Sequence, residues 1–141
     1  MNAPLYDTAL LRLAATIPHH RRLDQPDVTV ERRTPICGSR IVLDMTLDPA
    51  GRVAEIGLEV SACALGQASA HLFAAHAVER SPQELADARD ALAAWLDGIS
   101  DIPGSWPGLD ALARARPHRG RHAAILLPFE AGAQAAAEAQ R

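Results

Sequence analysis

The strand-like segment at residues 40–48 restricts the fold of this sequence more than any other feature. Apolar and polar residues alternate through it, as in a strand with one packed face and one face in water, and Asp44 lies on the face expected in water. Residues 48–52 then combine a proline and a glycine in the spacing of a tight hairpin turn, so residues 53–60 form the expected return strand. With a shorter alternating segment at residues 28–30, these strands predict an antiparallel meander.

The periodicity changes to that of helices after residue 63. Helices are expected at residues 6–15, 64–76, 81–98, 109–115 and 122–138, and the third begins with a capping box at Ser81. A loop rich in proline and glycine, residues 99–108, carries Trp106, which is expected to cover the sheet or to mark a partner surface. This order predicts an α+β fold, a small antiparallel three-stranded sheet with helices packed on one face.

Length and charge limit the class of protein. A chain of 141 residues is expected to form a single domain, residues 1–141. Its net charge of −3 argues against a nucleic-acid partner, and the absence of lysine excludes a Schiff-base lysine and the lysine of a phosphate-binding P-loop. No signal-peptide pattern is present, and no apolar run reaches the roughly 20 residues that span a membrane. We therefore expect a cytoplasmic protein with no membrane partner.

Both cysteines lie at places where thiols tend to be reactive. Cys37 stands between Pro35 and Gly38 in a turn before the strand at residues 40–48. Cys63 ends the last strand and opens a helix, whose unpaired amide donors and positive end would favour the thiolate. Because the two strands are antiparallel, both cysteines should lie at one edge of the sheet, where two thiolates would make a metal or sulfur site. The alternative is that each cysteine is a small buried apolar residue.

His122 is the histidine that could join the cysteines. It opens the last helix, after a loop that could return the chain to the same edge of the sheet, and imidazole is a common metal ligand. A solvated or structural role is the alternative. By contrast, His71 lies two helical turns beyond Cys63, roughly 12 Å along the helix axis, which is too far to share a metal with it. The sequence contains no nucleophilic triad and no glycine-rich phosphate cradle.

The order of these motifs resembles a known family. The segments that carry the resemblance are Pro35-Ile-Cys-Gly38 before a hairpin, Val60-Ser-Ala-Cys-Ala-Leu-Gly-Gln-Ala-Ser69, Ser81-Pro-Gln-Glu-Leu85 and Leu127-Pro-Phe-Glu-Ala131. Together they are similar to the IscU/NifU-type iron–sulfur cluster assembly scaffolds. The long interval after Cys63, with its tryptophan- and proline-rich insertion, is more like the SufU branch of that family.

The resemblance implies the IscU/NifU N-terminal fold and a non-enzymatic scaffold. Such a protein binds iron or a [2Fe–2S] cluster and transfers it to acceptor apo-proteins, and a cysteine desulfurase supplies the sulfur. By the same resemblance, Cys37 and Cys63 are the cluster-binding residues, and they form the metal ligands together with His122. Cys63 is also the candidate to accept a persulfide in sulfur transfer.

Two positions depart from the family pattern. Ser39 stands where relatives usually have aspartate, and the third cysteine is replaced by Ala123 or Ala124, depending on the alignment. Two alternatives therefore remain beside the scaffold. One is a zinc-stabilised persulfide acceptor for the desulfurase, in which Cys63 takes the persulfide and Cys37 helps to hold zinc. The other is a metal-free interaction protein on the same fold.

Overall fold

The structure of the chain, a computed structural model, describes residues 6–35 and 38–140. In chain order the elements are α1 (Thr8–Ala15), β1 (Val28–Arg33), β2 (Arg40–Leu47), β3 (Val53–Ser61), α2 (Ala64–His76), α3 (Pro82–Leu96), the 3₁₀ helices η1 (Leu109–Ala115) and η2 (Arg119–Arg121), and α4 (His122–Ala139). Apart from the short helix η2, which was not expected, these elements follow the order expected from the sequence. The expected capping box at Ser81 is present at the start of α3.

The sheet is an antiparallel meander with the strand order β1-β2-β3. The pairing of Arg33 with Arg40 leaves residues 34–39 as the loop between β1 and β2. β1 is longer than the expected residues 28–30, because its charged half, Glu31 to Arg33, also pairs with β2. The pairing of Arg40 with Ser61 places the start of β2 beside the end of β3.

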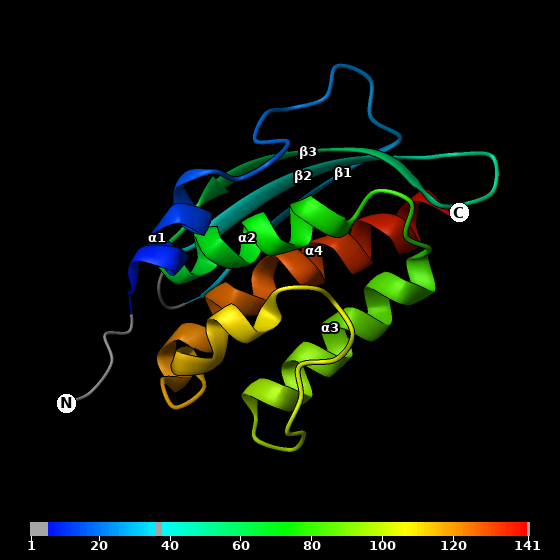
Figure 1. Ribbon diagram of the computed structural model, residues 1–141. Helices are drawn as coiled ribbons and strands as arrows, with labels where there is room; N and C mark the ends of the chain where they lie inside the picture. The colour runs from blue at the N-terminus through cyan, green and yellow to red at the C-terminus, as the bar shows by residue number, and fades with distance from the viewer. Residues whose placement is uncertain (1–5, 36–37, 141) are drawn as a thin grey trace.

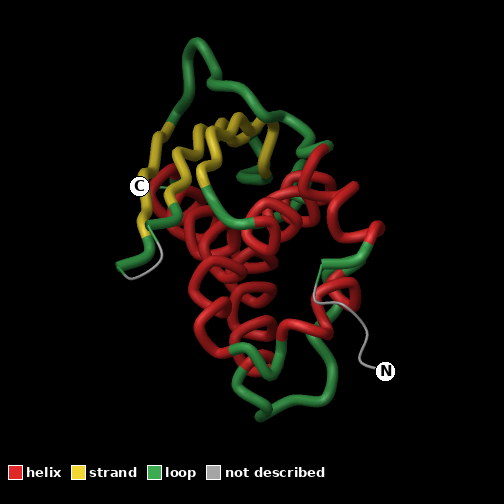
Figure 2. Tube along the Cα trace, turned by 90° about the vertical axis from the view of Figure 1, so that its left-hand side faces the viewer, coloured by secondary structure: helices red, strands yellow, loops and turns green. Residues whose placement is uncertain are grey.

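The helices cover one face of the curved sheet (Figure 1). α4 lies at the centre and packs against β1, β2, α2 and α3, whereas α1 packs against α2. A view turned by 90° shows the strands on one side of the molecule and the helices on the other (Figure 2). The predicted α+β fold, with an antiparallel three-stranded sheet and helices on one face, is therefore confirmed. None of the described helices is long and apolar enough to cross a membrane.

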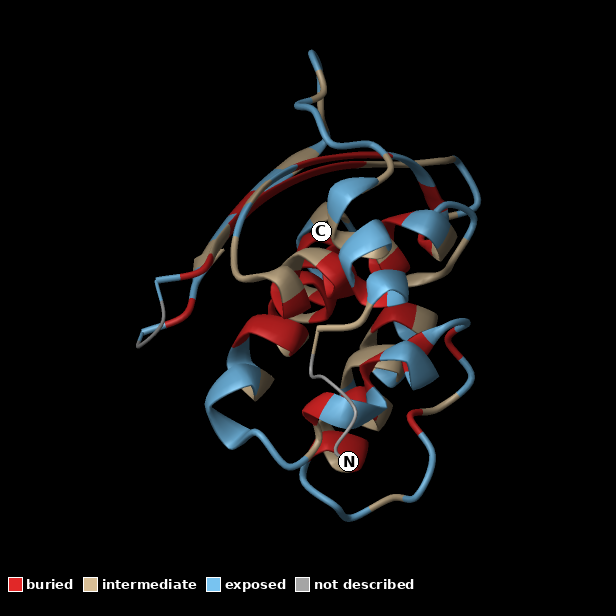
Figure 3. Cartoon of the chain, turned by 60° about the vertical axis from the view of Figure 1, so that its left-hand side comes forward, coloured by how far each residue is buried: buried red, intermediate tan, exposed pale blue. Residues whose placement is uncertain are grey.

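Buried residues concentrate between the sheet and the helices (Figure 3). Ile41, Leu43 and Met45 of β2 are fully buried, as their alternation predicts. Trp106 was expected to cover the sheet or to mark a partner surface, and both expectations are wrong. The ring is 6% exposed, lies parallel to the Phe73 ring at 5.8 Å between centroids, and donates a hydrogen bond from Nε1 to the Leu72 carbonyl oxygen at 2.8 Å. The insertion loop is therefore anchored on the helical layer through this tryptophan.

The contact between α2 and α4 depends on a glycine. A Cβ atom added at Gly132 of α4 would overlap the Phe73 ring of α2, so the ring occupies the space that a side chain would need. Phe73 in turn meets Phe129 edge to face at 5.4 Å between centroids. The helices can approach this closely because position 132 has no side chain.

Gly132→Ala should lower the free energy of unfolding by about 1–3 kcal/mol, because overpacking forces the Phe73 ring or the helix axis to move. Gly120→Ala is the matched control, since a Cβ there meets nothing within 4 Å. That control should stay within about 0.5 kcal/mol of the wild type. Urea denaturation measures both. Equal stabilities for the two variants would contradict this account of the contact.

The outer face of the sheet is covered, although the alternation in residues 40–48 predicts that this face contacts water. Residues 16–27 cross it (Figure 1), and Asp44 beneath them is fully buried. Arg22 donates hydrogen bonds to the Asp44 carboxylate from Nε at 2.7 Å and Nη2 at 3.1 Å. The Leu23 amide and the Thr29 hydroxyl donate two more, at 2.9 and 2.6 Å. The expectation that Asp44 faces water is therefore wrong, because the loop supplies this buried carboxylate with donors.

These contacts also set the ionisation of Asp44. Burial by itself raises the pKa of the carboxyl, but the hydrogen bonds from Arg22, Thr29 and Leu23 and the charge of Arg22 outweigh burial, so the pKa lies below its ordinary value of 3.8. A carboxyl whose pKa is lower in the folded state stabilises that state at neutral pH. The stabilisation is lost as the pH falls from the ordinary value through the lower, folded-state pKa.

Asp44→Asn should therefore destabilise the protein by about 2–3 kcal/mol at pH 7, because the amide cannot accept all of these hydrogen bonds. The difference from the wild type should shrink as the pH falls below about 4 and then through the lower folded-state pKa, where the wild-type carboxyl is protonated in both states. Glu59→Gln is the control, since Glu59 is exposed and lies 3.8 Å from Arg22. It should cost less than about 1 kcal/mol. A destabilisation by Asp44→Asn that persists unchanged at low pH would contradict the role of the charge.

Candidate functional site

The candidate site lies at the end of the sheet where β2 begins and β3 ends. The loop of residues 34–39 enters β2 there, and β3 leaves it toward α2. Cys37 belongs to this loop but lies outside the described residues. The register is the relevant observation: Arg40 follows Cys37 by three positions, Cys63 follows Ser61 by two, and Arg40 pairs with Ser61. The register thus places Arg40 and Ser61 side by side at one end of the sheet, with Cys63 two residues beyond Ser61.

Cys63 is the N-cap residue of α2. Its backbone is extended, with φ −65° and ψ 168°, and its carbonyl oxygen accepts the first helical hydrogen bond, from the Gln67 amide at 2.9 Å. The side chain makes no capping hydrogen bond, and the thiol is free and half-buried. A serine or aspartate at an N-cap usually satisfies the amides of the first turn. Here the sulfur leaves them unused, so both the thiol and the positive end of the helix are available to an anionic or metal-bound group.

The loop that carries Cys37 is closed by hydrogen bonds between its two ends. The Thr34 amide donates to the Ser39 carbonyl oxygen at 2.9 Å, and the Ser39 amide donates to Thr34 Oγ1 at 3.0 Å. Both residues are buried, and Gly38 has a φ of +72°, which favours glycine. The sequence suggested the bend through Pro35 and Gly38 but not the part played by Thr34. Its signal is a hydroxyl residue at the end of a strand, where side chains often bond to nearby backbone.

The start of α4 lies against the start of α2. A Cβ added at Gly66, one turn after Cys63, would lie 3.4 Å from the Cβ of Ala124, which is buried. Ser69 donates a hydrogen bond to the Ile125 carbonyl oxygen at 2.5 Å, so the two helices are also joined one turn further along. Ala123 is exposed. The last helix therefore begins beside the turn that carries Cys63, with Ala124 packed into the contact and Ala123 on the surface.

His122 is half-buried, and its ring is held by the end of η1. Nε2 lies 3.2 Å from the Ala115 carbonyl oxygen and 2.9 Å from that of Arg116. Because both partners are acceptors, Nε2 is the nitrogen that carries the hydrogen. A neutral His122 then keeps a lone pair on Nδ1, the arrangement in which ligand histidines are commonly oriented by a backbone carbonyl. The ring is thus suited to ligation, although its hydrogen bonds go to η1 and not to Cys63.

Two other histidines make local contacts. His71 Nδ1 lies 3.3 Å from Thr16 Oγ1, between α2 and α1. His20 Nε2 lies 3.4 Å from the Val60 amide, at the edge of β3. Among residues 6–35 and 38–140, no three His, Cys, Asp or Glu side chains gather closely enough to hold a metal ion.

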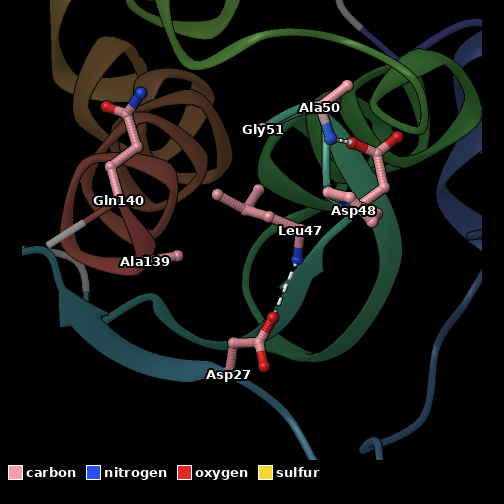
Figure 4. A pocket seen from close by; sticks show the side chains of 8 residues that line it. Asp27, Leu47, Asp48, Ala50, Gly51, Ala139 and Gln140 are labelled. Carbon is pink, nitrogen blue, oxygen red and sulfur yellow. Dashed lines mark hydrogen bonds between the residues drawn. The ribbon is translucent and has the colours of Figure 1, made fainter.

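A surface pocket lies at the opposite end of the sheet (Figure 4). It is formed by the β2–β3 turn, Asp27 and the end of α4 at Gln140. Its two carboxylates already accept backbone hydrogen bonds: Asp27 from the Leu47 amide, and Asp48 from the amides of Ala50 and Arg52. They hold the turn and the strand end in place, so this pocket is not the candidate site.

Comparison with known proteins relates this geometry to solved structures. A nitrogen-fixing NifU-like protein (N-terminal) from Brucella abortus is 28% identical, with a TM-score of 0.90 over 96% of this chain and 94% of that one. A putative iron–sulfur cluster assembly scaffold protein for the SUF system from Fervidobacterium islandicum AW-1 is 16% identical, with a TM-score of 0.82 over 94% of this chain and 96% of that one. A hypothetical protein is 20% identical, with a TM-score of 0.70 over 91% and 93% of the two chains.

No protein-family model matches the chain, and no curated protein matches its sequence. The structural neighbours nevertheless confirm the resemblance to IscU/NifU-type scaffolds. At identities of 16% and 20%, the second and third neighbours show the fold alone.

A cysteine at position 123 should restore a third thiolate, whereas one at position 124 should not. Ala123→Cys places sulfur on the exposed surface at the start of α4, and Ala124→Cys places it in the contact with Gly66. We expect Ala123→Cys to tighten Co²⁺ binding at least about tenfold, because thiolates are strong ligands for this class of metal. Thiolate-to-cobalt absorption in a titration measures the affinity. Tighter binding by Ala124→Cys than by Ala123→Cys would contradict this placement.

Proposed function

We propose that this chain, which resembles IscU/NifU-type scaffolds in its motifs and its fold, is a single-domain scaffold for iron–sulfur cluster assembly. On this proposal Cys37 and Cys63 bind iron or a [2Fe–2S] cluster as cargo, and the protein passes that cargo to acceptor apo-proteins. A cysteine desulfurase supplies the sulfur. The chain acts as an accessory protein in the cytoplasm and not as an enzyme.

The position of Cys63 is the observation that carries the proposal. Its thiol is free, half-buried and unused by the capping of α2, at the end of the sheet where the loop containing Cys37 joins β2. The neighbour that is 28% identical supports the same conclusion, because it is a NifU-like protein of the same fold over 96% of this chain. Position and fold together favour cargo binding over a purely packing role for the thiol.

The donor set is chemically suited to iron or to a cluster. Two thiolates are soft ligands, and iron in a cluster accepts histidine in place of cysteine at some positions. His122 could provide that imidazole from Nδ1, because Nε2 is committed to the carbonyl oxygens of Ala115 and Arg116. The positive end of α2 would offset part of the negative charge of the thiolates and sulfide. With fewer thiolates than relatives with three cysteines, this chain should hold its cargo more weakly and release it more readily.

Sulfur transfer to Cys63 needs no external oxidant. The Cys63 thiolate attacks the outer sulfur of the persulfide on the desulfurase, a new sulfur–sulfur bond forms on Cys63, and the desulfurase thiolate leaves. The two sulfur–sulfur bonds exchange, so the step involves no net oxidation or reduction. Release of that sulfur as sulfide would then require two electrons from a separate thiol or protein reductant.

Anaerobic reconstitution with iron and sulfide tests the scaffold. The wild type should develop sulfur-to-iron charge-transfer absorption, and Cys37→Ser and Cys63→Ser should each lose most of it because each variant removes one of two thiolate ligands. Ser61→Ala is the control, since Ser61 is exposed at the same end of the sheet and is not a proposed ligand. A colourless wild type, indistinguishable from both cysteine variants, would reject cluster binding.

The metal content of the protein as purified distinguishes the cluster scaffold from the zinc-stabilised persulfide acceptor and from the metal-free interaction protein. One zinc ion per chain, released by Cys37→Ser, would favour the zinc-stabilised persulfide acceptor over the cluster scaffold. Binding of the desulfurase with no metal at either cysteine would favour a metal-free interaction protein. Mass spectrometry of Cys63 after incubation with a desulfurase and its cysteine substrate would detect the persulfide directly.

A further inference from the structure

A basic segment, residues 114–121, stands out in a chain that is otherwise acidic. It contains four arginines, and no aspartate or glutamate occurs between Asp110 and Glu130. The rest of the chain has ten arginines against 17 acidic residues. Positive charge is thus concentrated on one short stretch, which includes η2 and leads directly into α4. A local charge of one sign in a chain of the opposite net charge is suited to selective attraction of a partner.

Two of the four arginines serve the fold. Arg114 pairs with Asp7 at 2.8 Å and so joins η1 to the cap of α1. Arg116 lies over the Trp95 ring and donates hydrogen bonds to the carbonyl oxygens of Trp95, at 2.9 Å, and Ser100, at 3.1 Å. These contacts fix one end of the basic segment. The hydrogen bonds of His122 to the end of η1 fix the other end.

The other two arginines, Arg119 and Arg121, make no such intramolecular contacts among the residues that the structure describes. Both are exposed, and neither has a carboxylate or carbonyl partner for its guanidinium group among the residues that the structure describes. Ordinary surface arginines of this chain are often paired, as Arg40 is with Glu31 and Arg80 with Glu84. Arg119 and Arg121 therefore present two unpaired guanidinium groups from a segment held at both ends.

The segment lies close to the candidate site. Arg121 precedes Ala124 by three residues, about one helical turn, and Ala124 packs against Gly66, which follows Cys63 by about one turn. A protein that contacts Arg119 and Arg121 would thus approach the end of the molecule where Cys63 lies. At that end it could form ion pairs with the two exposed guanidinium groups of Arg119 and Arg121.

We propose that Arg119 and Arg121 form an electrostatic docking point for an acidic surface of the protein that delivers sulfur to Cys63. This inference rests on the proposed function, because it takes the cysteine desulfurase as the sulfur donor. The guanidinium groups bind carboxylates of the donor and orient it so that its persulfide faces Cys63. Arginine suits this task because its planar group donates two parallel hydrogen bonds to one carboxylate.

A protein carboxylate fits the observations better than the phosphates of a nucleic acid or a lipid. Binding along a nucleic acid uses many phosphate contacts, and anionic membranes attract clusters of four or more basic residues. Here two of the four arginines are committed to internal contacts, and the net charge of −3 would repel an extended polyanion. Two guanidinium groups match a small acidic patch on a folded protein.

Titration calorimetry with the purified cysteine desulfurase of the same organism tests the docking point. Arg119→Glu/Arg121→Glu should weaken binding about tenfold or more at about 0.05 M salt, and the effect should diminish at about 0.3 M salt. Arg119→Gln/Arg121→Gln should give a smaller loss of the same kind. Arg21→Glu/Arg89→Glu is the control with the same change in net charge, on residues of the outer loop and of α3. It should change the affinity less than about threefold.

Three outcomes would overturn the docking point. It fails if the wild-type chain does not bind the desulfurase, if the Arg119/Arg121 variants bind as well as the wild type, or if the control loses affinity equally, because total charge would then be responsible. Cys63→Ser separates docking from chemistry, since it should keep the arginine-dependent affinity. Arginine-dependent binding of a wild type that never gains a persulfide at Cys63 would reject the proposed sulfur transfer and leave the docking point standing.

Discussion

The close approach of α2 and α4 joins the core of this protein to its candidate site. Gly132 leaves room for Phe73 in the middle of the contact, where Phe73 also meets Phe129 and Trp106. At its beginning, Gly66 lies against Ala124, and the Ser69 hydroxyl donates a hydrogen bond to the Ile125 carbonyl oxygen. Because interiors are close-packed, a shift of α4 in the core would be transmitted to the turn that carries Cys63. The contact between α2 and α4, with Gly132 as the position where a side chain has no room, therefore bears on the position of Cys63 as well as on the fold.

The two ends of the sheet have different tasks. At one end, the carboxylates of Asp27 and Asp48 accept hydrogen bonds from backbone amides and so hold the β2–β3 hairpin in place. At the other end, the loop of residues 34–39 is closed through Thr34 and Ser39, while the Cys63 thiol is left out of the capping of α2. Over the outer face, Asp44 and Arg22 hold the crossing loop. Hydrogen bonds thus fix the turns and the outer loop around the sheet, whereas the Cys63 thiol of the candidate site makes no capping hydrogen bond.

The end of the sheet at which the candidate site is proposed was predictable from the sequence, but the arrangement of the side chains around it was not. Antiparallel pairing follows from the alternation of the strands, and it places the start of β2 and the end of β3 together whatever surrounds them. The surroundings of His122 could not be foreseen, because the direction of its ring depends on the carbonyl oxygens at the end of η1. The same holds for Ala123 and Ala124, since only the packing of α4 on α2 decides which of the two is buried.

The sequence by itself determined the order of the elements, the meander, the capping of α3 and the resemblance to a scaffold family, because each depends on local patterns. Tertiary structure alone decided the burial of Asp44, the stacking of Trp106 on Phe73 and the assignment of the arginines of residues 114–121 to internal or free roles. An alternating strand cannot reveal that a distant loop will cover its polar face with Arg22. The physical reason is that burial and pairing depend on two segments that are distant in the sequence. The residues of one segment do not show which other segment will pack against it.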